Sequence, residues 1–153
     1  MNVTQTNVAG ADVVQAGNGP NLLLLHSLLA ERSVFDRALP DLASDYRVTL
    51  PNLPGFGGTP PLEMNNPSVA DYADHVANIM DKLNLPADTA VLGNGAGGFM
   101  AVALGIRYGE RIGKLVLVDT GPGFPVSAKA PLRLLADKVE EAGMDVVLDA
   151  AMA

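Results

Sequence analysis

A glycine-rich segment at residues 89–98, Thr-Ala-Val-Leu-Gly-Asn-Gly-Ala-Gly-Gly, is the part of this sequence best suited to chemistry. As Gly93-x-Gly95-x-Gly97, it has the spacing of the tight strand-to-helix turn of Gly-x-Ser-x-Gly enzymes, with glycine where their serine nucleophile stands. As Gly93-x-Gly95-x-x-Gly98, it matches the dinucleotide-binding fingerprint, in which a helix N-terminus holds phosphate charge. The two patterns predict acyl-transfer chemistry and cofactor binding, respectively.

The dinucleotide pattern also requires an acidic residue later in the sequence. An acidic residue should follow about 20 positions later, at the end of the next strand, to bind a ribose hydroxyl. Asp119 meets that condition. However, such a unit usually opens its domain, whereas two apolar strand-like runs and a long Pro/Gly-rich loop come first here. Binding of NAD or FAD therefore stays open as the alternative, and the main interpretation requires no cofactor.

Composition excludes several other classes of protein. The 153 residues carry a net charge of -7 without a cluster of Lys and Arg, which argues against a nucleic-acid surface. The absence of cysteine excludes disulfides and thiolate metal sites. The longest apolar run, Phe99 to Leu104, is far too short to cross a membrane, and no signal-peptide pattern opens the chain. We expect a soluble, cytoplasmic protein.

Strand and helix patterns alternate along the chain, which predicts a doubly wound, mostly parallel α/β sheet with right-handed crossovers. The predicted strands are a weak hairpin within residues 1–20 and apolar runs at 22–25, 46–50, 90–92 and 115–118, the last of them expected to be buried. The predicted helices are 34–43 with a bend near Pro40, 68–83 with Ser68 as N-cap, 98–108, 131–142 and 146–152.

Four motifs occur in one particular order. They are Leu22–Ser27 (Leu-Leu-Leu-Leu-His-Ser), Asn52–Gly57 (Asn-Leu-Pro-Gly-Phe-Gly), Gly93–Gly98, and Lys114–Thr120 (Lys-Leu-Val-Leu-Val-Asp-Thr). In this order the chain resembles the N-terminal half of an α/β-hydrolase superfamily member, and lactonase-like and esterase-like members are the most similar. The resemblance covers most of residues 20–153.

The resemblance implies a fold and a substrate class. Residues 1–122 would form the N-terminal part of an α/β-hydrolase core without its C-terminal strands, and residues 123–153 would begin a helical cap. Relatives would act on small ester, lactone or related carbonyl compounds. We also expect an oligomer, or a second polypeptide that completes the sheet, because the strand at 115–118 would otherwise have an open edge.

The sequence departs from the family pattern at several positions. Gly95 stands at the nucleophile position, and Ser27 replaces the glycine that normally follows the strand histidine. Asn52 stands where the family usually has aspartate. The chain also stops before the strands that would supply the catalytic acid and histidine. We therefore predict no appreciable esterase activity.

Specific roles follow from the resemblance for the remaining candidate residues. The backbone N–H of Ala96, with that of Ser27 or Leu28, would form an oxyanion pocket. His26 would order the oxyanion loop rather than act as a base. Asp119 would be either an acid, as in some subgroups, or an ordinary strand-end residue.

His75, the other histidine, falls on the polar side of its predicted helix beside Asp71 and Asp74. That position favours a solvated face over a metal site.

Glycine at position 95 leaves several functional interpretations open. Glycine relieves the strain of the turn, so the corner is either stabilised and catalytically silent or keeps an oxyanion pocket in which water or a substrate group attacks. An engineered replacement of serine, and a non-catalytic interaction module, fit the same sequence.

Overall fold

The computed structural model of the chain describes residues 2–121, 123 and 125–152, with side chains described up to residue 149. It divides into two compact units, residues 1–122 and 123–153. The boundary coincides with the predicted start of the cap, and the role of the second unit as a cap remains a prediction.

The first unit is built on a mixed six-stranded sheet with the order β1-β2-β4-β3-β5-β6. Its strands are β1 (Val3–Val8), β2 (Ala11–Ala16), β3 (Asn21–Leu25), β4 (Arg47–Pro51), β5 (Ala90–Asn94) and β6 (Lys114–Val118). The hairpin strands β1 and β2 are antiparallel to each other, and β2 is antiparallel to β4. The pairs β4–β3, β3–β5 and β5–β6 are parallel, as predicted. The carboxyl ends of β3, β4, β5 and β6 therefore lie at one edge of the sheet.

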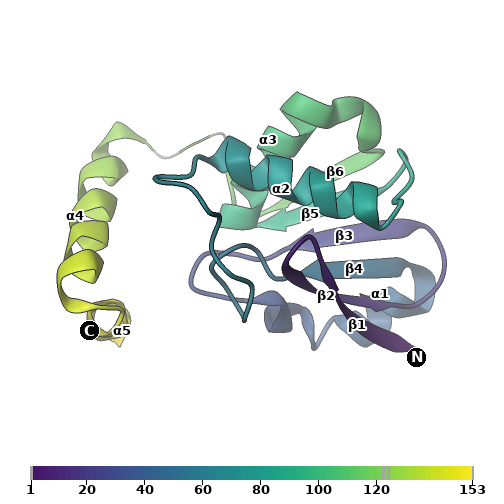
Figure 1. Cartoon of the computed structure of the whole chain (residues 1–153), viewed down its shortest axis with the longest axis horizontal. Helices are drawn as coiled ribbons and strands as arrows, with labels where there is room; N and C mark the ends of the chain where they lie inside the picture. Colours follow the sequence, from purple (N-terminus) through teal and green to yellow (C-terminus); the bar gives the residue numbers. More distant parts are fainter. Residues whose placement is uncertain (1, 122, 124, 153) are drawn as a thin grey trace. The chain divides into compact units, whose positions relative to one another are not determined.

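The helices cover opposite faces of this sheet, with α2 (Val69–Lys82) and α3 (Ala96–Tyr108) on one face and α1 (Leu39–Asp45) on the other (Figure 1). The four consecutive leucines of β3 supply both sides, because side chains alternate across a strand. Leu23 and Leu25 pack in the core under α2 and α3. Leu22 and Leu24 pack in the core on the α1 side. This explains why the run is uniformly apolar.

Local sequence signals account for the helix starts. Helix α2 begins at a complete capping box, in which Ser68 and Asp71 each bind the backbone of the other. The predicted helix at 34–43 is instead a short 3₁₀ helix, η1 (Arg32–Phe35), followed by α1. Pro40 lies in the first turn of α1, where its missing N–H costs no helical hydrogen bond.

The outermost strand, β6, corrects one prediction. The run 115–118 was expected to be buried, yet its four residues are each 41–43% exposed. Strand β6 pairs with β5 on one side and with no other strand of the described chain. It therefore contributes an open apolar edge to the sheet.

The second unit contains α4 (Val126–Ala142) and α5 (Asp145–Met152), which contact each other. Two amphipathic helices were predicted here, but α4 begins before the predicted start and contains Pro131 inside the helix. A proline at that point removes one helical hydrogen bond. Among the described residues, no helix combines the length and apolar character needed to span a membrane.

A candidate active site at the Gly95 turn

Gly95 lies in the turn between β5 and α3, the position at which the sequence predicted a strand-to-helix corner. Its backbone adopts φ 53° and ψ −118°, in a region that residues with side chains rarely occupy. The Gly95 N–H donates to the carbonyl oxygen of Val118 at 3.0 Å, and the Gly95 carbonyl accepts from the Gly98 N–H at 3.0 Å. The turn is thus held at both ends, by β6 and by the first turn of α3.

Close packing explains the neighbouring glycines. A Cβ on Gly97 would collide with the carbonyl oxygen of Leu25, and a Cβ on Gly98 would collide with the side chain of Thr120. The start of α3 therefore rests directly on the ends of β3 and β6. The glycine spacing that suggested a phosphate-binding loop is accounted for by helix–sheet packing.

The structure brings Ser27 and Gly95 together. Ser27 opens the loop after β3, and a Cβ built on Gly95 would overlap the Ser27 hydroxyl oxygen and lie 3.0 Å from Ser27 Cβ. Within the described part of the chain, Ser27 Oγ makes no hydrogen bond. Nothing in the sequence indicates that the side-chain positions of these two residues compete for one space.

The amides proposed for an oxyanion pocket lie at two element ends. Ala96 is the first residue of α3, so the helix itself supplies no carbonyl for its N–H. Ser27 and Leu28 lie in the loop after β3, and the Leu28 side chain is exposed. Their use in binding remains a prediction.

His26 is fully buried and bridges two loops. Its Nδ1 lies 2.9 Å from the carbonyl oxygen of Ser27, and its Nε2 accepts from the Leu53 N–H at 2.9 Å. Because a carbonyl can only accept, Nδ1 carries the proton and the ring is neutral. Burial lowers the pKa of His26, which maintains that neutral state. The ring edge also packs against Phe56, with ring centroids 5.3 Å apart.

A polar network behind this loop was missed by sequence analysis. Asn52 Nδ2 donates to Asp12 Oδ2 at 3.1 Å and to the carbonyl of Gly57 at 2.8 Å, and Asn52 Oδ1 accepts from the Arg32 N–H at 2.8 Å. Arg32 Nε also reaches Asp12 Oδ2 at 3.0 Å. The network ties the loop after β3 to β2 and to the loop after β4. Asn52, noted only as a departure from aspartate, is therefore a required donor.

Asp119 follows β6 and is exposed, with φ 51°. It lies at the carboxyl edge of the strand beside β5, which is the place that both the acid and the ribose-binding interpretations require. The next residue, Thr120, has a buried hydroxyl oxygen without a partner in the described chain.

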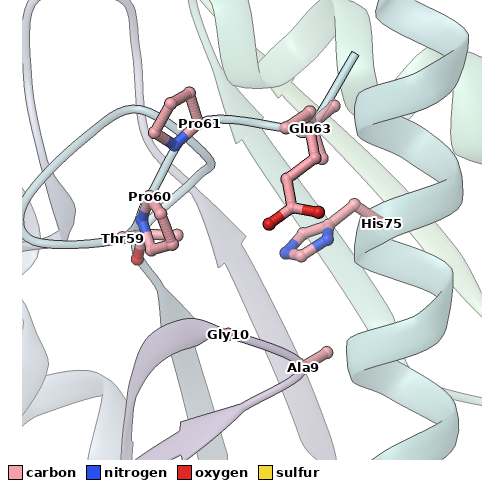
Figure 2. Close-up of a pocket in the computed structure, with 8 residues that line it drawn as sticks. Ala9, Gly10, Thr59, Pro60, Pro61, Glu63 and His75 are labelled. Carbon is pink, nitrogen blue, oxygen red and sulfur yellow. The ribbon is translucent and has the colours of Figure 1, made fainter.

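His75 corrects a second prediction, because its ring is not on a solvated face. It lines a hollow of about 440 Å³ together with the β1–β2 turn and residues 59–63. Figure 2 shows its ring and the Glu63 carboxylate directed into this space. The Nε2 atom is buried without a partner among the described groups, and burial lowers the pKa of the ring. Neither Gly95 nor Ser27 lines the hollow.

No group of three or more potential metal-ligating side chains occurs in the part of the chain that the structure describes. At the carboxyl edge of the sheet, the structure brings together the Gly95 turn, the Ser27 hydroxyl and the loop that His26 orders.

A model of the alpha/beta hydrolase fold family matches residues 20–141. The chain belongs to this α/β-hydrolase family.

Individual members of the α/β-hydrolase family resemble the chain over part of their length. A pimeloyl-[acyl-carrier protein] methyl ester esterase of Aeromonas hydrophila is 38% identical over 112 residues, which are 73% of this chain and 42% of that protein. A second esterase of that name, from Aromatoleum aromaticum, is 35% identical over 74% of this chain and 44% of its own length. The chain thus spans less than half the length of these curated relatives.

Solved structures show the same α/β-hydrolase fold. A thermophilic esterase from Thermogutta terrifontis, with malate bound, superimposes with a TM-score of 0.83 and 23% identity over 98% of this chain and 57% of that one. A serine-to-glycine mutant of the N-acyl homoserine lactonase AidH, complexed with N-hexanoyl homoserine lactone, gives a TM-score of 0.67. It is 27% identical over 80% of this chain and 46% of that one.

Proposed function

We propose that this chain is the N-terminal half of an α/β-hydrolase core, and that it binds small esters or lactones at the Gly95 turn without cleaving them. The observation that carries the proposal is the backbone of Gly95. It has the positive φ of a nucleophile-bearing turn, but it offers no side chain that could attack a carbonyl carbon. The turn keeps its backbone donors, which bind a carbonyl oxygen but form no covalent intermediate with it.

The described positions of the two histidines support this absence of turnover. A general base must reach the proton that it removes. His26 has both ring nitrogens engaged, with Ser27 and Leu53, and its ring is buried. His75 lines the separate hollow beside residues 59–63. Neither histidine is therefore in position to activate a serine or a water molecule at Gly95.

The names of similar proteins indicate the substrate class. Relatives include esterases for the methyl ester of a pimeloyl group, and the N-acyl homoserine lactonase acts on an acylated lactone, as its name states. The serine-to-glycine mutant of that lactonase is complexed with N-hexanoyl homoserine lactone. A chain with glycine at the corresponding kind of turn would similarly hold an acyl ligand.

Hydrolysis of p-nitrophenyl butyrate tests the catalytic half of the proposal. We expect the purified chain to release p-nitrophenol at the rate of buffer alone, because it lacks both nucleophile and base. Gly95→Ser combined with Ser27→Gly, which removes the overlapping side chain, should add no activity, since the base is still missing. Turnover well above buffer by the unmodified chain would disprove the proposal, provided that it follows the protein through purification.

The binding half is tested by NMR on ¹⁵N-labelled chain titrated with N-hexanoyl homoserine lactone. We expect saturable shifts at the Ala96 and Leu28 amides, because a carbonyl oxygen placed at the turn would accept from them. Amides of α2 serve as the internal control. Unchanged Ala96 and Leu28 signals at millimolar ligand would refute binding at this turn.

A second candidate function rests on Asp119, which directly follows β6, the parallel strand next to β5, as a ribose-binding residue would. Saturable binding of NAD or FAD that is lost in Asp119→Ala would favour this candidate. Tight binding of another protein, with neither nucleotide nor acyl ligand bound, would favour a non-catalytic interaction module.

A further inference from the structure

The two departures from the family pattern at positions 27 and 95 meet at one point of the structure. The family carries glycine after the strand histidine and serine in the turn, whereas this chain carries Ser27 and Gly95. These residues are 68 positions apart in sequence, yet Ser27 supplies the three atoms nearest to a Cβ built on Gly95. The departures are therefore spatially coupled.

The distances from a Cβ built on Gly95 to the atoms of Ser27 show how the two residues restrict each other. The added Cβ would overlap Ser27 Oγ, would lie 3.0 Å from Ser27 Cβ, and would lie 3.8 Å from Ser27 Cα. Only the last of these is an ordinary van der Waals separation. A side chain at position 95 therefore requires the Ser27 hydroxyl to rotate away and Ser27 Cβ to shift slightly, whereas glycine at position 27 would remove both contacts. The Ser27 side chain fits as observed only if residue 95 is glycine.

The Ser27 hydroxyl lies where it could donate a hydrogen bond to a bound ligand. Ser27 Oγ has no hydrogen-bond partner in the described chain and is only partly exposed. It lies against the turn that presents the Ala96 N–H, the place where an acyl carbonyl would be held. The proton on a serine hydroxyl can be donated to such a carbonyl oxygen without any base.

We propose that residues 27 and 95 form an exchanged pair, in which Ser27 carries the hydroxyl that relatives carry in the turn and donates it as a hydrogen bond to the carbonyl of a bound ester or lactone. Ser27 is then a ligand-binding residue and not a nucleophile, because no base among the residues that the structure describes contacts its hydroxyl. The ligand half of this inference rests on the proposed function. The pairing half does not.

Thermal unfolding of a set of variants tests the pairing without any ligand. Gly95→Ala is made in three backgrounds: Ser27, Ser27→Ala and Ser27→Gly. The strain of positive φ is common to all three, so differences between them report contact with residue 27. We expect the fall in Tm to be largest with serine, intermediate with alanine and smallest with glycine, with at least about 3 °C between the extremes.

Equal falls in Tm in the three backgrounds would overturn the pairing. If Gly95→Ala with Ser27 does not fold, folding of the same substitution with Ser27→Gly supports the pairing, and failure in both backgrounds contradicts it. Gly10→Ala is the matched control, because Gly10 also has positive φ and a Cβ there meets no neighbouring atom within 4 Å. Its effect should be the same in all three backgrounds.

Calorimetric titration with N-hexanoyl homoserine lactone tests the hydroxyl. We expect Ser27→Ala to weaken binding about threefold to tenfold, which is the value of one hydrogen bond, while Ser33→Ala leaves it unchanged. Equal affinity of Ser27→Ala and the unmodified chain would overturn the ligand role of Ser27 and leave the proposed function standing. No binding by the unmodified chain would instead refute the proposed function and the ligand role together, with the pairing still decided by the Tm series.

Discussion

His26 connects the loop after β3 to the loop after β4, and it does so only while its ring is neutral. Its Nε2 accepts the Leu53 N–H, so a proton on Nε2 would oppose that N–H and break the link. Burial lowers the pKa of His26, and burial also lowers the pKa of His75. Protonation of His26 would therefore release the loop that carries Ser27.

A dependence of stability on pH follows from these two pKa values. Histidines in the unfolded chain have a pKa of about 6.5, and burial lowers the pKa of both histidines in the folded chain. As the pH falls through this range, the unfolded state therefore binds more protons than the folded state. We expect the free energy of unfolding to decrease between pH 7.5 and pH 5.5 in urea titrations. Asp71 and Asp74, whose pKa values are lowered by hydrogen bonds from Ser68 and Arg107, respectively, titrate below this window.

The decrease should be smaller in His26→Gln and smaller still when His75→Gln is added. If either variant is unfolded, the same conclusion can be read from the histidine ring signals of the unmodified chain by NMR. Ring signals that titrate at or above the value of a free histidine would contradict the prediction.

Asn52 illustrates a residue choice that is decided by a neighbour distant in sequence. Aspartate at this position would place a second carboxylate next to Asp12 and would lose the donor to the Gly57 carbonyl. We predict that Asn52→Asp lowers the free energy of unfolding by about 1–3 kcal/mol at pH 7.5. Urea unfolding measures this, with exposed Asn65→Asp as the matched control. Adding Asp12→Asn should restore part of the lost free energy of unfolding. A double variant that is less stable than Asn52→Asp alone would contradict this explanation.

At the scale of elements, α2 depends on its N-terminal cap. The Ser68 N–H donates to Asp71 Oδ2 at 2.7 Å, and the Ser68 hydroxyl accepts from the Asp71 N–H at 3.4 Å. We expect Ser68→Ala to lower the free energy of unfolding by about 0.5–2 kcal/mol. The comparison is Ser127→Ala, an exposed serine in α4. Identical urea midpoints for the two variants would show that the cap contributes nothing measurable.

Side-chain pairs join α2 to α3 and to the short 3₁₀ helix η2 (Gly109–Arg111) that follows it. Arg107 of α3 forms two hydrogen bonds with Asp74, at 2.7 and 2.8 Å, and Arg111 of η2 pairs with Asp81. These pairs are mostly exposed, so each adds little to stability. Their effect is to align α3, whose first turn forms the Gly95 corner.

For the molecule as a whole, β6 is the feature with the largest consequence. Its backbone has strand partners on one side only within the described chain, and its side chains expose apolar surface on both faces. On the face opposite α3, Val116 borders a hollow of about 600 Å³ that is also lined by Leu22, Leu92 and Leu42. Open apolar edges of this kind favour pairing with another strand.

We therefore expect the isolated chain to self-associate in a concentration-dependent manner through β6. Light scattering coupled to size-exclusion chromatography should show an apparent mass above 15.8 kDa that falls on dilution. Val116→Lys should shift the protein toward monomer, because a charged side chain on an edge strand opposes edge-to-edge pairing. Ile106→Lys, at an 80% exposed position of α3, should not. A monomer at all concentrations would exclude this assembly.

Patterns within short stretches of the sequence determined much of the fold. The apolar run of β3, the capping box at Ser68 and the glycine corner at residue 95 each depend on neighbours a few positions away. Backbone periodicity and turn chemistry act at that range, so the elements were predictable. The order of the strands within the sheet was not predicted and is given by the structure.

Only the tertiary structure decided which of these residues meet. The contact of Ser27 with Gly95, the bond from Asn52 to Asp12 and the burial of His75 all join segments separated by many residues. Such contacts depend on which strand ends lie side by side, and a strand's own composition does not contain that information. The sequence alone therefore indicated a turn without its nucleophile, whereas the folded chain revealed that a hydroxyl from another loop occupies the space.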